Sequence, residues 1–368
     1  MAGEADFERE GLLEGLADDE REARLDLLQQ LDAAGVPLET LKRACEEDRL
    51  AMLPVELVFS GDLRHTVADV LENTGLSREF LARDMLALGL PMPEGGPAYT
   101  DSDLDAFKGL KQLLDAGFPE DRVLELARLA GRSSAQLAQA ILENFGRVFL
   151  RAGDTERDAG LRFADMARGL TPSLGPLVET PLRRHILELV RREVIGRAEI
   201  LAGELPGARD VTVAFADLVG FTSFSAGTSA EEVGDLAGML ERLAGEVAEP
   251  PVRLIKLIGD AAMLAAPEPE PLVAATRDLV AAVADHGTLP QLRAGVALGR
   301  ALNRSGDWYG HPVNLASRLT GAAEPSSLLA SDPVAAATGE QFAWRAAGTR
   351  ELKGIAEPVS VFALAAVD

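Results

Sequence analysis

Acidic side chains stand at two points in the C-terminal half of the chain where short apolar runs end. Asp217 follows the run VTVAFA, and Asp260 lies between the apolar runs VRLIKLI and AAMLAA. The first run predicts a strand that ends at its carboxylate, and Gly-Asp between two alternating runs predicts a hairpin with Asp260 at its tip. Two carboxylates at strand ends commonly hold two Mg²⁺ ions in phosphoryl and nucleotidyl transfer. Taken singly, either aspartate could equally be a turn former or a helix cap.

The turn that follows Asp217 adds phosphate-binding groups. A tight turn through Gly220 exposes backbone N–H groups, with Phe221 and Thr222 as the next residues, before a helix expected near Ser229. Backbone amides in such a turn suit phosphate oxygens, while the carboxylate takes the cation. Lys256 is a lone charge inside VRLIKLI, and because burying it without a partner is costly, we expect it to face a ligand.

A third run, SGDWYGHPVNLASRLTG, carries a further polar set. Asp307 precedes an expected turn at Gly310, and Pro312 predicts a helix start that places Asn314 and Arg318 four residues apart on one face. A planar amide and a guanidinium pointing the same way can hold a ribose and a phosphorus that gathers negative charge. A helix with this pair is common when considered alone.

The elements that must position these residues change in kind near residue 205. Before it, apolar residues recur at helical spacing, as in LDLLQQLDAAGV; after it, β-type runs alternate with helical patterns. We therefore predict a helical domain at 1–179, a connecting helix and linker at 180–207, and a catalytic α+β domain at 208–368. The connecting helix is expected to start at Thr180 and Pro181 and to end before GELPGARD.

Composition excludes several classes of protein. The formal net charge of -23 opposes binding to phosphate backbones, so nucleic acid is not an expected partner. TVADVLENTGLSREFLARD has a helix-turn-helix pattern similar to transcription regulators of the mercury-resistance type, but Arg78 and Arg83 are offset by Glu79 and Asp84, which favours a packed bundle. The single cysteine, the absence of a secretion signal, and the lack of apolar stretches of roughly 18 to 20 residues predict a cytoplasmic protein with no membrane span.

Together these motifs resemble a known family. Residues 208–365 resemble the catalytic domain of class III nucleotidyl cyclases, through the runs FADLVGFT, KLIGDA, GDWYGHPVNLASRL and ELKGI in the family's order. The resemblance implies a ferredoxin-like βαββαβ core. It also implies a homodimer in which two such domains associate head to tail and form two equivalent clefts.

The resemblance further implies a role for each matching residue. Asp217 and Asp260 match the metal carboxylates for two Mg²⁺ or Mn²⁺ ions, and Asn314 and Arg318 match the transition-state pair. The purine-binding pair corresponds to Lys256 and Asp307, the combination that selects adenine, and the lysine that steadies the terminal phosphates corresponds to Lys353. ATP would then become 3′,5′-cyclic AMP and pyrophosphate. In the family, one protomer supplies the metal carboxylates and its twin supplies the remaining groups.

Two alternatives stay open at this point. A guanylyl cyclase is disfavoured by Lys256 and Asp307. A non-catalytic helix-turn-helix sensor that keeps the cyclase fold for dimerisation is disfavoured by the intact metal carboxylates and by the negative charge of the chain.

The N-terminal half has a resemblance of its own. Residues 1–203 look similar to the regulatory region of the acid-responsive adenylyl cyclases of actinobacteria, which implies an autoinhibitory helical dimer, higher activity at acidic pH, and a fatty acid or other lipid between helices. The residues themselves offer His185, whose protonation would add to the charges of Arg183 and Arg184, although a solvated surface histidine is the simpler interpretation. Apolar runs such as RLAMLPVELVF fit a lipid or ordinary core packing equally well.

Overall fold

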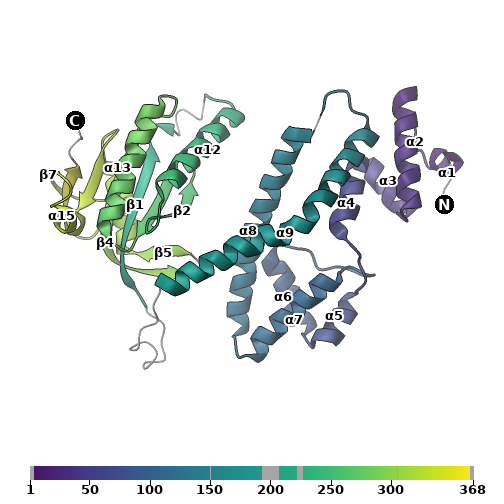
Figure 1. Ribbon diagram of the computed structural model, residues 1–368, viewed down its shortest axis with the longest axis horizontal. Coiled ribbons are helices and arrows are strands. Elements are labelled where there is room, and N and C mark those ends of the chain that lie inside the picture. The colour runs from purple at the N-terminus through teal and green to yellow at the C-terminus, as the bar shows by residue number, and fades with distance from the viewer. Residues whose placement is uncertain (1–3, 150, 193–206, 222–226, 305, 365–368) are drawn as a thin grey trace. The chain divides into compact units, whose positions relative to one another are not determined.

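The computed structural model describes residues 4–149, 151–192, 207–221, 227–304 and 306–364. The chain divides into two compact units, Met1–Val194 and Ile195–Asp368 (Figure 1). Each unit has hydrophobic clusters of its own. The first unit is helical, and the second is a sheet covered by helices.

The described part of the first unit is a succession of helices, as its 3.6-residue apolar periodicity predicts. They are α1 (Glu4–Arg9), α2 (Asp18–Ala33), α3 (Leu38–Glu46), the 3₁₀ helix η1 (Leu50–Met52), α4 (Leu53–Ser60), α5 (Val67–Thr74), α6 (Arg78–Leu88), α7 (Asp101–Asp115), α8 (Glu120–Phe149) and α9 (Glu156–Arg192).

Two hydrophobic clusters hold these helices together. One lies among α1 to α4, with Leu27 and Leu41 fully buried. The other lies among α5 to α8 and includes Leu81 and Phe107. The first unit therefore consists of two small helical bundles in sequence.

The helix-turn-helix pattern is present as α5 and α6. The Thr66 hydroxyl accepts a hydrogen bond from the Asp69 backbone N–H at 3.2 Å, and the Asp69 carboxylate accepts one from the Thr66 N–H at 2.7 Å, so α5 begins in a capping box. Gly75 ends α5 at a φ of 71°, in the left-handed region that glycine adopts without strain. Both helices contribute buried side chains, such as Val70 and Leu81, to the hydrophobic cluster of the second bundle.

Helix α9 differs from the sequence prediction in where it starts. The connecting helix was expected to begin at Thr180, but Thr180 and Pro181 lie inside α9, which begins at Glu156 and also contains Pro172 and Pro176. The first turns of α9 are anchored, because Glu156 accepts two hydrogen bonds from Arg24 at 2.7 and 3.1 Å. An interior proline removes one backbone hydrogen bond and commonly bends or breaks a helix, but α9 continues through all three of its prolines. The expected residues 193–203 lie outside the described part of the chain.

The second unit contains eight strands and four helices among its described residues. The strands are β1 (Arg209–Leu218), β2 (Arg253–Ile258), β3 (Ala261–Ala266), β4 (Leu292–Arg304), β5 (Asp307–Gly310), β6 (Leu328–Ser331), β7 (Trp344–Arg350) and β8 (Val359–Leu364), and the helices are α12 (Ala230–Val247), α13 (Pro269–His286), α14 (His311–Ala322) and α15 (Asp332–Thr338).

The sheet has the order β2-β3-β1-β4-β6-β8-β7, and β5 pairs with β4. Its first four strands, with α12 between β1 and β2 and α13 between β3 and β4, form the predicted βαββαβ core in the ferredoxin-like order. The predicted fold class is confirmed. The segment expected to turn at Gly310 is instead the short strand β5, because residues 307–310 pair with the end of β4.

Alternation along β1 sends its side chains to two different cores. Ala214 and Ala216 belong to the cluster under α12 and α13, whereas Val213 and Phe215 belong to the cluster under α14. Asp217 follows Phe215 by two residues and is therefore on the α14 face of the sheet.

Candidate active site

The two predicted metal carboxylates lie at the same corner of the sheet. Asp217 is near the end of β1 and is opposite Ala261, the first residue of β3, while Asp260 occupies the tight turn between β2 and β3. The Leu218 N–H donates a hydrogen bond to the Asp260 carbonyl oxygen at 3.1 Å, which ties the hairpin tip to the end of β1. Burial, and then the charge of Asp217, raise the pKa of Asp260, so the two carboxylates influence each other.

Arg293 joins these carboxylates, and the sequence analysis missed it. It is opposite Asp217 on β4, and its Nη2 and Nε donate to Asp217 Oδ2 at 2.8 and 3.1 Å. Its charge also acts on Asp260, where it lowers the pKa against the effect of burial. The signal was available: Arg293 is a lone charge at the start of the apolar strand LRAGVAL, the same kind of feature that singled out Lys256.

The carboxylates suit a divalent cation that arrives with a nucleotide. Among the described residues, no group of three or more His, Cys, Asp or Glu side chains could hold a metal ion. Mg²⁺ usually keeps several waters and is bound by one or two carboxylates together with substrate phosphates, rather than by an all-protein cage. Asp217 and Asp260, both only partly exposed, match that donor set.

Lys256 and Asp307 are brought together from separate parts of the sheet. Lys256 is on β2 and Asp307 begins β5, and their side chains form an ion pair. The other carboxylate oxygen of Asp307 accepts a hydrogen bond from the Trp308 N–H at 2.9 Å, which fixes its orientation. Lys256 is opposite Met263, a residue of the cluster under α14, so this pair shares a sheet face with Asp217.

Asn314 and Arg318 lie one turn apart on α14, as the spacing predicted. Both side chains are exposed, whereas Leu315 and Leu319 of the same helix are buried against the sheet. Within the described part of one protomer, no ion pair or side-chain hydrogen bond joins them to Asp217 or Asp260. The outward face of α14 is thus available to another molecule.

The remaining residues predicted to bind the substrate, Lys353, Phe221 and Thr222, differ in their exposure and in whether the structure describes them. Lys353 is exposed between β7 and β8, and with Glu351 and Glu357 it lines a surface cavity of about 490 Å³. Phe221 has a buried side chain in the core under α12 and α13, so a phosphate-binding role could belong only to its backbone. Thr222 lies outside the described residues.

Two known families match this chain. Residues 5–190 match the adenylate cyclase regulatory domain, and residues 205–366 match the adenylate and guanylate cyclase catalytic domain. The chain belongs to the adenylate cyclase family. The regulatory match falls on the helical unit of this cyclase, and the catalytic match falls on the unit that carries the carboxylates and the Lys256–Asp307 pair.

Individual relatives of this cyclase cover most of its length. A pH-sensitive adenylate cyclase of Mycobacterium tuberculosis is 38% identical over 316 residues, which are 81% of this chain and 80% of the relative. An adenylate cyclase of Streptomyces coelicolor is 31% identical over 289 residues, 77% of this chain and 74% of the relative. The crystal structure of an adenylyl cyclase from P. aeruginosa aligns with a TM-score of 0.38 at 24% identity, over 44% of this chain and 96% of that chain.

Hydropathy along the helices of this cyclase gives no membrane-spanning candidate. None of the helices in the described ranges combines the length and the apolar character needed to cross a bilayer.

Proposed function

We propose that this chain converts ATP to 3′,5′-cyclic AMP and pyrophosphate, with two Mg²⁺ or Mn²⁺ ions, in a cleft between two protomers of a homodimer. The observation that carries the proposal is that Asp217 and Asp260 lie at one sheet corner and that Asp217 shares a sheet face with Lys256, the partner of Asp307. Membership of the cyclase family supports it.

Asp217 and Asp260 would hold the cations. When bound, the ions lower the pKa of the ribose 3′-hydroxyl and offset the charge on departing pyrophosphate. Arg293 compensates the charge of Asp217 until a cation is bound, and keeps that carboxylate in one orientation. The exposed Lys353 would add positive charge for the terminal phosphates.

The Lys256–Asp307 pair is complementary to adenine. The ring nitrogen N1 of adenine accepts a hydrogen bond and its 6-amino group donates one, whereas guanine offers a donor and an acceptor at the same places. A lysine ammonium can only donate, and an ionised aspartate can only accept. The pair therefore favours ATP over GTP, because GTP would leave both side chains facing like groups.

The outward face of α14 favours a site shared between two protomers. Asn314 and Arg318 are exposed and one turn apart, where they can reach the ribose and the α-phosphate of a nucleotide held by the partner's carboxylates. A lone protomer would then lack one half of each cleft. Dimer formation becomes the step at which the N-terminal domain can regulate activity.

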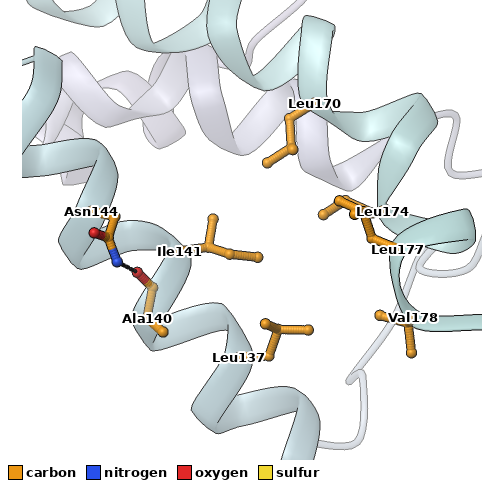
Figure 2. Close-up of a pocket in the computed structure, with 8 residues that line it drawn as sticks. All are labelled: Leu137, Ala140, Ile141, Asn144, Leu170, Leu174, Leu177 and Val178. Carbon is orange, nitrogen blue, oxygen red and sulfur yellow. Dashed lines mark hydrogen bonds between the residues drawn. The ribbon is translucent and has the colours of Figure 1, made fainter. Parts of the chain in front are cut away.

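The helical unit offers two features for that regulation. His185 is exposed on α9 beside Arg183 and Arg184, and the pH-sensitive relative supports a response to acid in this chain as well. The second feature is a groove between α8 and α9 of about 440 Å³, lined mainly by apolar side chains including Ile141, Leu170 and Leu174 (Figure 2). Its size and lining suit the acyl chain of a fatty acid.

A cytoplasmic location fits the same proposal. ATP is the substrate, and Cys45 is an unpaired cysteine with a partly buried thiol, as expected in a reducing compartment.

One incubation separates this function from its alternatives. Purified full-length protein with Mn²⁺ is given either ATP or GTP, and the products are resolved by chromatography. Cyclic AMP from ATP supports the proposal. Cyclic GMP as the main product would make the chain a guanylyl cyclase, and absence of both products would leave the non-catalytic sensor. Mass spectrometry of denatured protein tests the groove separately, since a bound fatty acid would be released.

A further inference from the structure

Asp84 is a fully buried acidic side chain in the helical unit. It has no exposed surface, and among the described residues neither of its carboxylate oxygens has a hydrogen-bond partner. Buried carboxylates are ordinarily paired or hydrogen-bonded, since an isolated charge in an apolar setting is very costly. Asp84 therefore requires a physical explanation.

The position of Asp84 places it at a contact between two helices. It lies four residues before Leu88, on the same side of α6, and α6 packs against α8. The two backbones touch there, because a Cβ atom added to Gly131 of α8 would come within 2.3 Å of the Leu88 carbonyl oxygen. Leu81 and Met85, the buried neighbours of Asp84 on α6, belong to the apolar cluster of the second bundle.

The charged groups around this contact are directed elsewhere. Arg83 of α6 pairs with Glu120 at the start of α8 at 2.9 Å, and Arg122 of α8 pairs with Glu125 at 3.0 Å. The other charged groups on the elements around this contact are exposed or bound elsewhere. Glu72, Arg78, Glu79, Asp121, Arg128 and Arg132 are exposed. His65 contacts Asp101, Asp69 contacts Thr66, Asp103 contacts Thr100, Lys108 contacts Asp105, and Lys111 contacts Asp115. Tyr99 is in the same cluster, and its buried hydroxyl group also has no hydrogen-bond partner in the described part of the chain.

We propose that Asp84 is a pH-responsive element of the regulatory unit: its carboxyl group is neutral where α6 packs on α8, and its ionisation at higher pH loosens this helix contact. Burial raises the pKa of Asp84. An aspartate whose pKa is raised on folding stabilises the folded state most fully below its unfolded-state pKa of about 3.9. That stability is lost as the pH rises through the folded-state pKa, so acid tightens the α6–α8 contact.

Hydrogen exchange on the full-length protein tests the proposal directly. Exchange of α6 and α8 amides is followed from acidic to alkaline pH, corrected for its intrinsic pH dependence, in the wild type and in Asp84→Asn. Relative to the variant, we expect the equilibrium constant for opening the wild-type contact to rise by up to about tenfold for each pH unit. This rise should level off above the pKa of Asp84 in the folded protein. Glu79→Gln, an exposed change on the same helix, is the matched control and should follow the wild type.

The outcomes decide the proposal in either direction. Equal pH dependence in the wild type and in Asp84→Asn would overturn it. If Asp84→Asn is poorly folded, Asp84→Leu is used in the same exchange experiment. A contact that accommodates a neutral carboxyl group should also accommodate leucine, which has the same number of side-chain heavy atoms. Failure of both variants to fold at acidic pH would contradict the neutral state of Asp84.

A second readout connects the contact to catalysis and rests on the proposed function. Helix α8 packs on α9, which ends the described part of the regulatory unit, so a change in the contact can bias activity. We expect the pH profile of cyclic AMP synthesis to shift in Asp84→Asn and to stay unchanged in Glu79→Gln. If the wild type makes no cyclic AMP, the proposed function fails while the exchange experiment still decides the role of Asp84.

Discussion

Asp217 and Asp260 are the residues on which the proposed chemistry depends. We expect Asp217→Asn and Asp260→Asn each to lower kcat for ATP by about two to three orders of magnitude, because a neutral amide binds a divalent cation poorly and the charge of the transition state is then less well offset. Initial rates at saturating Mn²⁺ and ATP measure the effect.

An exposed aspartate on the same strand supplies the control. Asp210→Asn at the start of β1 should leave kcat unchanged. Undiminished rates in either carboxylate variant would contradict the assigned metal role.

The Lys256–Asp307 pair is the set of side chains that we expect to select the base of the nucleotide. Changing both residues, Lys256→Glu with Asp307→Cys, replaces a donor by an acceptor and should reduce the ratio of kcat/KM for ATP over GTP by at least about tenfold. Arg253→Glu, an exposed change at the start of the same strand, should keep the wild-type ratio. An unchanged preference in the double variant would remove the pair from base recognition.

At the scale of elements, the close contact between β4 and α14 positions the helix that carries Asn314 and Arg318. A Cβ atom added to Gly295 would lie 2.3 Å from the Thr320 backbone nitrogen and 2.5 Å from the Ala316 carbonyl oxygen. We expect Gly295→Ala to push α14 off the sheet, destabilise the protein by about 1–3 kcal/mol and lower cyclase activity, since α14 carries Asn314 and Arg318.

Thermal unfolding and ATP turnover, measured on the same samples, test that expectation. Gly299→Ala is the matched control on the same strand, because its Cβ would meet Pro312 Cδ at an ordinary 3.5 Å. If both variants unfold at the same temperature, tight packing at Gly295 does not fix the position of α14.

Some elements could be predicted from sequence because their signals are local. The β2–β3 hairpin is such a case, since two alternating apolar runs meet at Gly259 and Asp260, and glycine there has a φ of 62°. Helical spacing alone also predicts that Asn314 and Arg318 lie on one face of a helix.

Other features depend on distant contacts and were missed or misplaced. The first turn of α9 is anchored by Arg24, which is far away in sequence, whereas the local sequence at Thr180 and Pro181 predicts a helix start. The contact of Arg293 with Asp217 depends on the pairing of β4 with β1. In the sequence, Asp84 is only one of the two acidic residues that offset Arg78 and Arg83, and the packing of α6 shows that its side chain is buried.

For the whole molecule, the two compact units suggest that regulation and catalysis are separate, which a truncated protein can test. We expect full-length protein to change its cyclic AMP output between about pH 5.5 and 8, while residues 204–368 alone lack that added dependence. The measurement is the ratio of the activity of the full chain to that of residues 204–368 at each pH. Identical profiles would place the pH response outside the regulatory unit, and His185→Gln in the full chain would show whether that histidine contributes.

A cleft completed by two protomers is the central claim, and mixing two inactive variants tests it most directly. Asp217→Asn lacks a metal carboxylate, and Arg318→Ala lacks a transition-state group that the partner would need. When the two variants are co-expressed and the mixed dimers are purified, one cleft combines the intact halves and the other carries both defects. We expect mixed dimers to regain a substantial fraction of wild-type cyclic AMP synthesis, whereas each variant alone stays inactive. Mixed dimers as inactive as the separate variants would show that a single protomer must supply all of these groups.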